Sequence, residues 1–383
     1  MIVYVREQGA KISKESQRLV VTTDDNKRII FTDNLEQLVI FGNVQLTTQS
    51  IYLLLRKNID TVFLRYDGRY LGRLSNNESA NVFLRKKQFD LLNDVKFCAN
   101  FARSIVQAKL FNQATIMSRI KRAHKQPLAG DAASELRDIA LKLDKTDDID
   151  VMRGIEGSGA ALYFKHFSLG LKDDWGFTKR VRRPPTDPVN AVLSLLYTLL
   201  INRTYAAVRL AGLDPYPAAL HSLTYGRQSL PLDLVEEFRA MIADTLTLSL
   251  FNMHVLKKDD FEVVNNQNEF CTHQGDNIDI DAAVNDSFGA MSSEEVIQDV
   301  NDLSDEQVHD SFADRPSDRL PVLLKKDAFS RVIAAFSKKL DTEFLHPYAA
   351  KQMSYAEAII YQARLYRKLV DGEINYYIPL TLR

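Results

Sequence analysis

The sequence predicts an α+β protein in which a small β-rich domain, residues 1–80, precedes a larger, all-α helical domain, residues 81–383. Two changes of pattern support this fold class. Up to residue 73, short runs rich in Val, Ile, Phe and Tyr are separated by turn residues, as is typical of strands. From about residue 82, apolar residues recur with the spacing of amphipathic helices. A chain of 383 residues is long enough for more than one core.

The N-terminal part contains five strand-like segments, one short helix and a hairpin turn. Asp67-Gly68 predicts the turn, because this dipeptide favours tight hairpins. The segment TTQSIYLLLRKN has helical spacing instead, and Thr47 or Thr48 can cap the helix. The strand-like segments are MIVYVRE, RLVVTT, KRIIFT, QLVIFGN and DTVFLRY.

The longest predicted helix of the second part covers FCANFARSIVQAKLFNQATIMSRIKRAH. Phe97, Phe101, Ile105 and Val106 form its apolar stripe. We expect its basic residues on the opposite, solvated face: Arg103, Lys109, Arg119, Lys121 and Arg122. Further helices are predicted after a turn at Asp187-Pro188, over residues 231–256, and in SYAEAIIYQARLYRKLVDG before the C-terminus.

The net charge of −1 hides an uneven distribution of charge. Residues 259–319 carry 17 Asp or Glu and 2 Arg, a net charge of −15, and the rest of the chain carries a net charge of +14. The acidic segment is Asn-rich and mostly aperiodic, which predicts a loop-like or partly disordered insertion. The basic remainder favours a polyanionic partner such as nucleic acid, although a solvated basic surface without a partner has the same composition.

Several classes of location are disfavoured by the sequence. The N-terminus lacks the layout of a signal peptide, and no run of 18 apolar residues predicts a membrane span. Cys98 and Cys271 lie far apart and form no CxxC pair, which suits a reducing compartment. We therefore expect a cytoplasmic protein with no membrane partner.

The first candidate for chemistry is Glu156 in RGIEGSGAALYF. The small residues that follow it let another segment approach closely, which would press the carboxylate against a neighbouring element. An exposed glutamate near a helix start, stabilised by the helix dipole, explains the same residues. The sequence pattern leaves both interpretations open.

The second candidate is the stretch LHSLTYGRQSLPLDLVEEF, which places His221 shortly before Asp233 and Glu236. The two carboxylates are three residues apart and share a helix face. Beside apolar side chains they would repel each other, and a divalent cation relieves that repulsion. Carboxylates suit Mg²⁺ or Mn²⁺, and an imidazole favours Mn²⁺ somewhat. A dipole-stabilised acidic helix start with a structural histidine remains the alternative.

A basic loop, KRVRRPP, contains Arg180, Arg182 and Arg183 and is stiffened by two prolines. Guanidinium groups held in such a loop can contact phosphate oxygens in pairs. A solvated basic loop is the plainer interpretation.

Four motifs occur in an order that resembles a known family: RGIEGSGAALYF, RRPPTDPVNAVLSLLYTLL, AGLDPYPAALHSLTYGRQSLPLDLVEEFR and YQARLYRKLVDGEINYYIP. The chain resembles the CRISPR-associated integrase that inserts new spacers, the universal nuclease of CRISPR adaptation, over nearly its whole length except residues 259–319. The resemblance implies a β-rich N-terminal domain that dimerises and an all-helical catalytic domain. It also implies a small ferredoxin-like partner protein and double-stranded DNA, both protospacer and CRISPR repeat, as binding partners.

The resemblance assigns the catalytic residues one by one, with Glu156, His221 and Glu236 as metal ligands and Asp233 as a close catalytic support. Glu156 matches the family's IEG glutamate, His221 the motif histidine, Glu236 the second acid of the DLxE motif and Asp233 its first acid. It implies a Mg²⁺- or Mn²⁺-dependent DNA endonuclease and integrase, in which a 3′-hydroxyl attacks a phosphodiester. We expect phosphate contacts from Arg180, Arg182, Arg183 and Arg227.

Three other functions are alternatives, although the filled positions Glu156, His221 and Glu236 argue against one of them, the non-catalytic scaffold. A transposon-linked integrase of the same superfamily would carry the same motifs, a non-catalytic DNA-binding scaffold would need a broken ligand set, and a basic RNA-binding module would share the charge. The family pattern often has glycine where PAAL precedes His221, and it lacks the acidic insertion. That insertion could mimic DNA, dock another adaptation protein, or be a tolerated surface loop.

Overall fold

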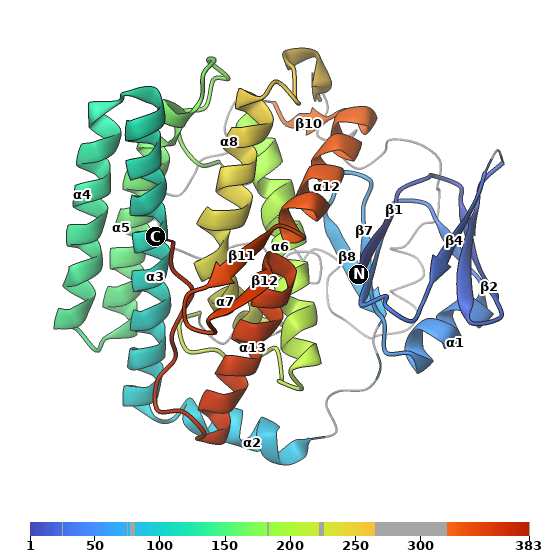
Figure 1. Ribbon diagram of the computed structural model, residues 1–383, viewed down its shortest axis with the longest axis horizontal. Helices are drawn as coiled ribbons and strands as arrows, with labels where there is room; N and C mark the ends of the chain where they lie inside the picture. The colour runs from blue at the N-terminus through green and yellow to red at the C-terminus, as the bar shows by residue number, and fades with distance from the viewer. Residues whose placement is uncertain are drawn as a thin grey trace, which may run out of the picture.

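The structure, a computed structural model, describes residues 1–24, 26–74, 76, 81–181, 184–221, 226–264 and 320–382. Within these ranges it confirms the predicted fold class, because a strand-rich N-terminal part precedes a mostly helical part (Figure 1). The last N-terminal strand, β8, ends at Leu74, and the first helix after it, α2, begins at Val82.

The N-terminal part consists of two four-stranded sheets and one helix. One sheet has the order β1-β5-β7-β8, with only β8 antiparallel to its neighbour, and the other has the order β4-β3-β2-β6. Helix α1 spans Thr48–Arg56, and Thr47 caps it by accepting a hydrogen bond from the Ser50 amide, as predicted. The strands are β1 (Ile2–Val5), β2 (Lys11–Glu15), β3 (Arg18–Thr22), β4 (Lys27–Phe31), β5 (Gln37–Phe41), β6 (Gln45–Leu46), β7 (Asp60–Leu64) and β8 (Tyr70–Leu74).

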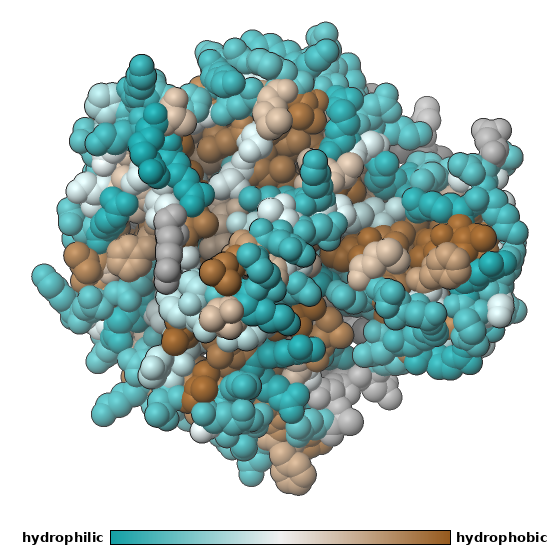
Figure 2. All heavy atoms as spheres, in the orientation of Figure 1, coloured by the Kyte–Doolittle hydropathy of each residue, from teal (hydrophilic) through white to brown (hydrophobic). Residues whose placement is uncertain are grey.

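The two sheets share a core, and the outer strand β4 leaves apolar side chains exposed. Side chains from both sheets and from α1 form one hydrophobic cluster, which includes Ile12, Leu38 and Leu53. On β4, an edge strand, Ile29 is 41% and Phe31 65% exposed. Figure 2 shows an apolar band on this side of the N-terminal part, among otherwise hydrophilic surface.

The predicted turn at Asp67-Gly68 is confirmed between β7 and β8. The Arg65 amide donates to the Arg69 carbonyl at 2.7 Å, and Gly68 has a φ of +91°, which a side chain would oppose.

The C-terminal part is built around long helices. Helix α3 is 30 residues long and packs against α4, α5 and α7. Helix α6 begins after Asp187, whose side chain accepts from the Asn190 amide, with Pro188 in its first turn, as the sequence predicted. The helices are α2 (Val82–Leu91), α3 (Val95–His124), α4 (Pro127–Lys142), α5 (Ile149–Phe167), α6 (Pro188–Leu210), α7 (Ser229–Arg239), α8 (Thr245–Asn252), α12 (Lys326–Leu340) and α13 (Tyr355–Asp371).

This part is mostly rather than entirely helical. Strands β9 (Phe261–Val263) and β10 (Val322–Leu324) form one antiparallel pair, and β11 (Glu343–His346) and β12 (Lys351–Ser354) form another. Strands of three or four residues are too short to show an alternating pattern, which is why the all-helical prediction missed them. The predicted helix over 231–256 is divided by a π-helical turn at Ala240–Asp244.

Strands β9 and β10 hold together the two ends of the acidic insertion. The Val264 amide donates to the Pro321 carbonyl at 2.9 Å. The chain therefore leaves and re-enters the fold at one place. The rest of the insertion, residues 265–319, lies outside the described residues, as does Cys271.

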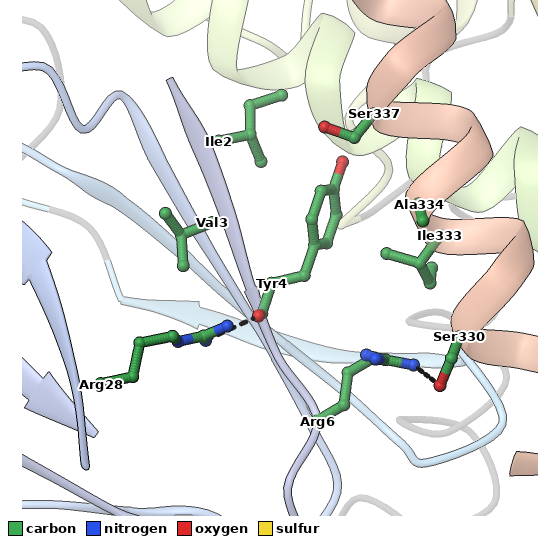
Figure 3. Close-up of a pocket in the computed structure, with 9 residues that line it drawn as sticks. All are labelled: Ile2, Val3, Tyr4, Arg6, Arg28, Ser330, Ile333, Ala334 and Ser337. Carbon is green, nitrogen blue, oxygen red and sulfur yellow. Dashed lines mark hydrogen bonds between the residues drawn. The ribbon is translucent and has the colours of Figure 1, made fainter. Parts of the chain in front are cut away.

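The two parts of the molecule pack against each other through the central strand β5. Its residues are buried on both faces: Leu38 belongs to the core of the N-terminal part, whereas Phe41 packs edge-on against Phe329 of α12 at 5.2 Å. Beside this contact, a cleft of about 260 Å³ lies between β1 and α12 (Figure 3). There Arg6 donates to the Ser330 hydroxyl, and Arg28 donates to the Tyr4 carbonyl at 3.1 Å.

Helix α6 is long and apolar enough to cross a membrane by length and composition alone. In this structure, however, 83% of its most apolar stretch is buried inside the protein. A core helix has the same properties, so α6 gives only weak support for a membrane span.

Candidate active site

Glu156 is buried where α5 approaches α3. Asp148 caps α5 by accepting from the amides of Asp150 and Val151. A Cβ atom added to Gly159 would lie 2.3 Å from Leu110 Cδ2 of α3, so the small residues after Glu156 do permit a close helix contact. Glu156 itself is 6% exposed. Of the two interpretations of this motif, the structure supports the carboxylate pressed against a neighbouring element.

Glu236 reaches the same region from α7. All residues of α7 are buried, and Glu236 and Asp233 have no exposed surface. A buried carboxylate needs compensation by hydrogen bonds or positive charge. For Glu236, that compensation includes an ion pair with Arg239 of the same helix, at 3.2 Å.

Lys109 of α3 joins the two glutamates. Its Nζ atom pairs with Glu156 Oε1 and lies 2.6 Å from Glu236 Oε2, and its side chain is 5% exposed. The structure thus brings Glu156 and Glu236 together around one ammonium group. This geometry corrects the prediction that Lys109 lies on a solvated face. Lys109 follows Ile105 by four residues, so helical spacing already placed it on the apolar stripe.

Asp233 holds His221 rather than joining the two glutamates. Its carboxylate accepts from the amides of Ala219, Leu220 and His221, each at 3.0 Å, and lies 2.6 Å from His221 Nδ1. Nδ1 thus faces Asp233, and Nε2 is the ring nitrogen on the opposite side. In this geometry Asp233 positions His221, and its expected catalytic role stays a prediction.

The His221 loop also lies against α5. Arg153, one helical turn before Glu156, donates to the Leu220 carbonyl at 2.6 Å. Among the residues that the structure describes, however, no three His, Cys, Asp or Glu side chains are close enough to hold a metal ion as they stand. The predicted ligands thus come from adjoining segments, with Lys109 between two of them.

Of the four predicted phosphate-binding arginines, the structure describes two, Arg180, which is partly buried, and Arg227, which is buried. Arg180 donates to the Val181 carbonyl at 2.8 Å, to Asn190 Oδ1 at 2.9 Å and to Ser194 Oγ at 3.0 Å. Its guanidinium therefore anchors its loop to α6, and Arg227 is only 5% exposed. For Arg180 and Arg227, phosphate contact therefore stays a prediction. Arg182 and Arg183 lie outside the described residues.

Two buried acids that the sequence did not single out flank the site. Glu237 accepts from Tyr377 at 2.6 Å, from Gln362 at 2.8 Å and from the Leu380 amide, and burial raises its pKa to about 7. Asp244, in the π-helical turn, accepts from Tyr197 at 2.6 Å and from Tyr163 at 3.0 Å. Burial raises the pKa of Asp244 to about 6.

The cleft of Figure 3 is separate from this site. It is lined by residues of β1, α12 and their neighbours, and none of the predicted site residues that the structure describes lines it.

Comparison with known proteins gives the family. The profile described as CRISPR associated protein Cas1 matches residues 3–278. The CRISPR-associated endonuclease Cas1 3 of Thermus thermophilus is 29% identical, over 100% of this chain and 97% of its own length.

Two solved structures share the fold. A casposase bound to integration product has a TM-score of 0.77 and 17% identity, over 100% of this chain and 94% of its own. A Cas6-RT-Cas1–Cas2 complex has a TM-score of 0.75 and 20% identity, over 100% of this chain and 36% of the matched chain. Since the family profile matches well over half of the sequence, this chain belongs to the CRISPR associated protein Cas1 family.

Proposed function

We propose that the protein is a divalent-metal-dependent DNA integrase and endonuclease that inserts short DNA duplexes into a CRISPR repeat array. Family membership supports the reaction class, and relatives are named as endonucleases. The observation that carries the proposal is the convergence of Glu156 from α5 and Glu236 from α7 on one positive charge. Buried carboxylates from different helices that share a cation are suited to hold a divalent metal ion.

The donors present fit Mg²⁺ or Mn²⁺. Glu156 and Glu236 supply carboxylate oxygens, and the ammonium of Lys109 shows that a cation is accommodated between them. His221 supplies an imidazole nitrogen, whose orientation Asp233 fixes through Nδ1. Two oxygens and one nitrogen suit Mn²⁺ and Mg²⁺ better than a soft metal.

In the proposed reaction, the 3′-oxygen of the incoming strand forms a bond to a phosphorus atom of the repeat. The bond from that phosphorus to the 3′-oxygen of the repeat strand breaks, so one phosphodiester replaces another. When bound, the metal polarises the phosphate and stabilises the departing oxygen. Water in place of the 3′-hydroxyl gives hydrolysis, which explains how one site supports both integrase and endonuclease activity.

This chain's own residues contribute position and charge to that reaction. Arg239 keeps a second positive charge beside Glu236, at 3.2 Å. Burial of Glu156 and of all of α7 limits the access of water around the carboxylates. Fixed charges in such surroundings act more strongly on a phosphate than they would in water.

The proposed partners are double-stranded DNA, a second copy of the chain and a small ferredoxin-like protein, in the cytoplasm. The related complex described above contains a Cas2 protein, which supports a small partner here. The exposed side chains of Phe31 and Ile29 on the edge strand β4 support dimerisation through the N-terminal part.

A transposon-linked integrase is the second candidate, because the casposase shares the fold. At 17% identity, that likeness concerns the fold alone. Adjacent CRISPR repeats in the genome would favour the first function, and terminal inverted repeats of a mobile element would favour the second.

Integration into supercoiled plasmid tests the proposal. We expect a 3′-OH duplex to be joined to a repeat-bearing plasmid in Mn²⁺ or Mg²⁺, more efficiently with the small partner, and not in EDTA. The non-catalytic scaffold would bind both DNAs and join neither.

A further inference from the structure

Lys109 is an unusual lysine, because it is buried between the two glutamates expected to bind metal. It lies in the middle of α3, with Ala108 and Leu110 on either side at 1% and 0% exposure. Its Nζ atom contacts Glu156 Oε1 on α5 and Glu236 Oε2 on α7. A lysine is almost never this deeply buried unless it is paired, and here the pairing involves both carboxylates.

The four charged groups of these ion pairs balance one another without a metal ion. Glu156 and Glu236 carry two negative charges, and Lys109 and Arg239 carry two positive charges. In a buried site, two carboxylates without counter-ions would repel strongly and pay desolvation. Lys109 therefore lets the chain fold with both acids in place before a metal ion binds.

A divalent cation and the ammonium would compete for the same oxygens. Metal–oxygen bonds to Mg²⁺ are about 2.1 Å long, shorter than the 2.6 Å between Nζ and Glu236 Oε2. A metal ion held by Glu156 and Glu236 would therefore need the carboxylates that the Lys109 ammonium now contacts. With the ion and the ammonium both in place, Lys109, Arg239 and the ion would together carry four positive charges. Glu156 and Glu236 would carry only two negative charges.

We propose that Lys109 is a built-in counter-ion that the divalent cation displaces from between Glu156 and Glu236. The proposal rests on the metal site put forward above. The ammonium stabilises the metal-free fold and lowers the affinity for metal, because each ion that binds must first break two ion pairs. Lys109 is thus a positioning residue of the acidic pair and a determinant of metal affinity.

Calorimetric titration of Mn²⁺ into the full-length, EDTA-treated and dialysed protein tests this exchange. The variants are Lys109→Met, which removes the charge at similar length, and Lys109→Gln, which keeps a hydrogen-bond donor. Lys96→Met is the matched control, since Lys96 lies on the same helix and is exposed. We expect both Lys109 variants to bind Mn²⁺ at least tenfold more tightly than the wild type and Lys96→Met.

Thermal unfolding supplies a second readout, which a purely structural role would not reproduce. In EDTA, Lys109→Met should unfold at a lower temperature than the wild type, and Mn²⁺ should raise its midpoint by more than it raises that of the wild type. A midpoint lowered equally with and without Mn²⁺ would mean that Lys109 is only structural.

The possible outcomes separate this inference from the metal site on which it rests. Equal or weaker Mn²⁺ binding by the Lys109 variants contradicts the exchange alone. Lack of Mn²⁺ binding by every protein, wild type included, contradicts the metal site as well. Failure of both Lys109 variants to fold in Mn²⁺ also contradicts the exchange, because a bound cation should replace the missing charge.

Discussion

Glu236 and Glu237 are adjacent on α7, both fully buried, and yet they are stabilised in opposite ways. Glu236 pairs with the cations of Lys109 and Arg239. Glu237 accepts hydrogen bonds from neutral donors instead, namely Tyr377, Gln362 and the Leu380 amide.

The difference teaches how one helix can serve both structure and chemistry. Glu237 fastens the C-terminal segment to the helical core through these neutral donors, and burial raises its pKa to about 7. Such a carboxylate favours its protonated form in the fold. Glu236 is held by cations, which another cation can replace. We expect substitutions at Glu237 to affect stability, and those in the Glu236 cluster to affect metal binding and DNA joining.

The largest expected effect is on catalysis at the charged cluster. Glu156→Gln or Glu236→Gln should lower DNA joining by at least about 10³-fold, because loss of a ligand charge weakens metal-assisted stabilisation of the leaving oxygen. Initial rates on the plasmid substrate measure this, with the exposed Glu135→Gln of α4 as control. The glutamine variants would refute the site assignment if they joined DNA at the wild-type rate.

Glu237, which is held by neutral donors, should instead make the stability of the protein depend on pH. A folded pKa of about 7 means that folded Glu237 binds a proton that the unfolded chain has released above about pH 4.5. Stability from this group is therefore greatest at low pH and declines as pH rises toward and through 7. In metal-free buffer, Glu237→Gln should remove a decline of about 3 kcal/mol in unfolding free energy between pH 4.5 and 8.

Urea unfolding at several pH values measures that decline. If wild type and Glu237→Gln show parallel pH profiles, Glu237 is ionised alike in the folded and unfolded chains. Metal affinity should be nearly the same in the wild type and in Glu237→Gln. This result would separate the effect of Glu237 on stability from the effect of Glu236 on metal binding.

Asp233 should give an intermediate effect, because it acts through His221. Asp233→Asn loses the charge that orients the Nδ1–H group and is expected to lower Mn²⁺ affinity and joining by about 10- to 100-fold. The exposed Asp138→Asn on α4 is the control. A change in stability alone, with Mn²⁺ affinity intact, would leave Asp233 as a loop anchor only.

The smallest effect is expected at Arg180. Arg180→Met should lower the unfolding free energy by about 1–2 kcal/mol, since it loses hydrogen bonds to Asn190 and Ser194. DNA affinity measured near physiological salt should fall no further than in the exposed control Arg122→Met. A selective loss of DNA affinity would instead support Arg180 as a phosphate contact.

Local signals predicted much of the fold. Three predicted features depend only on residues that are close together in the chain, so the local sequence is enough to predict them. They are the Thr47 cap, the Asp67-Gly68 turn and the start of α6 at Asp187. The pairs β9–β10 and β11–β12 were missed because their strands are too short for a pattern.

At the site, residue types were easier to predict than partners. The small residues after Glu156 correctly indicated a close helix contact. Lys109 was assigned to the surface, because a charged residue on an amphipathic helix usually faces water. Its two partners lie 47 and 127 positions further along the chain, at Glu156 and Glu236, and only the tertiary fold brings them together. The same holds for Arg180, whose loop folds back onto α6.

The most direct test of the account is a crystal structure of the protein grown or soaked in Mn²⁺, with anomalous scattering used to locate the ion. We predict one Mn²⁺ bound by the carboxylates of Glu156 and Glu236 and by His221 Nε2, with Lys109 Nζ moved out from between the carboxylates. A manganese peak elsewhere, with the Lys109 ammonium still paired to both glutamates, would contradict it.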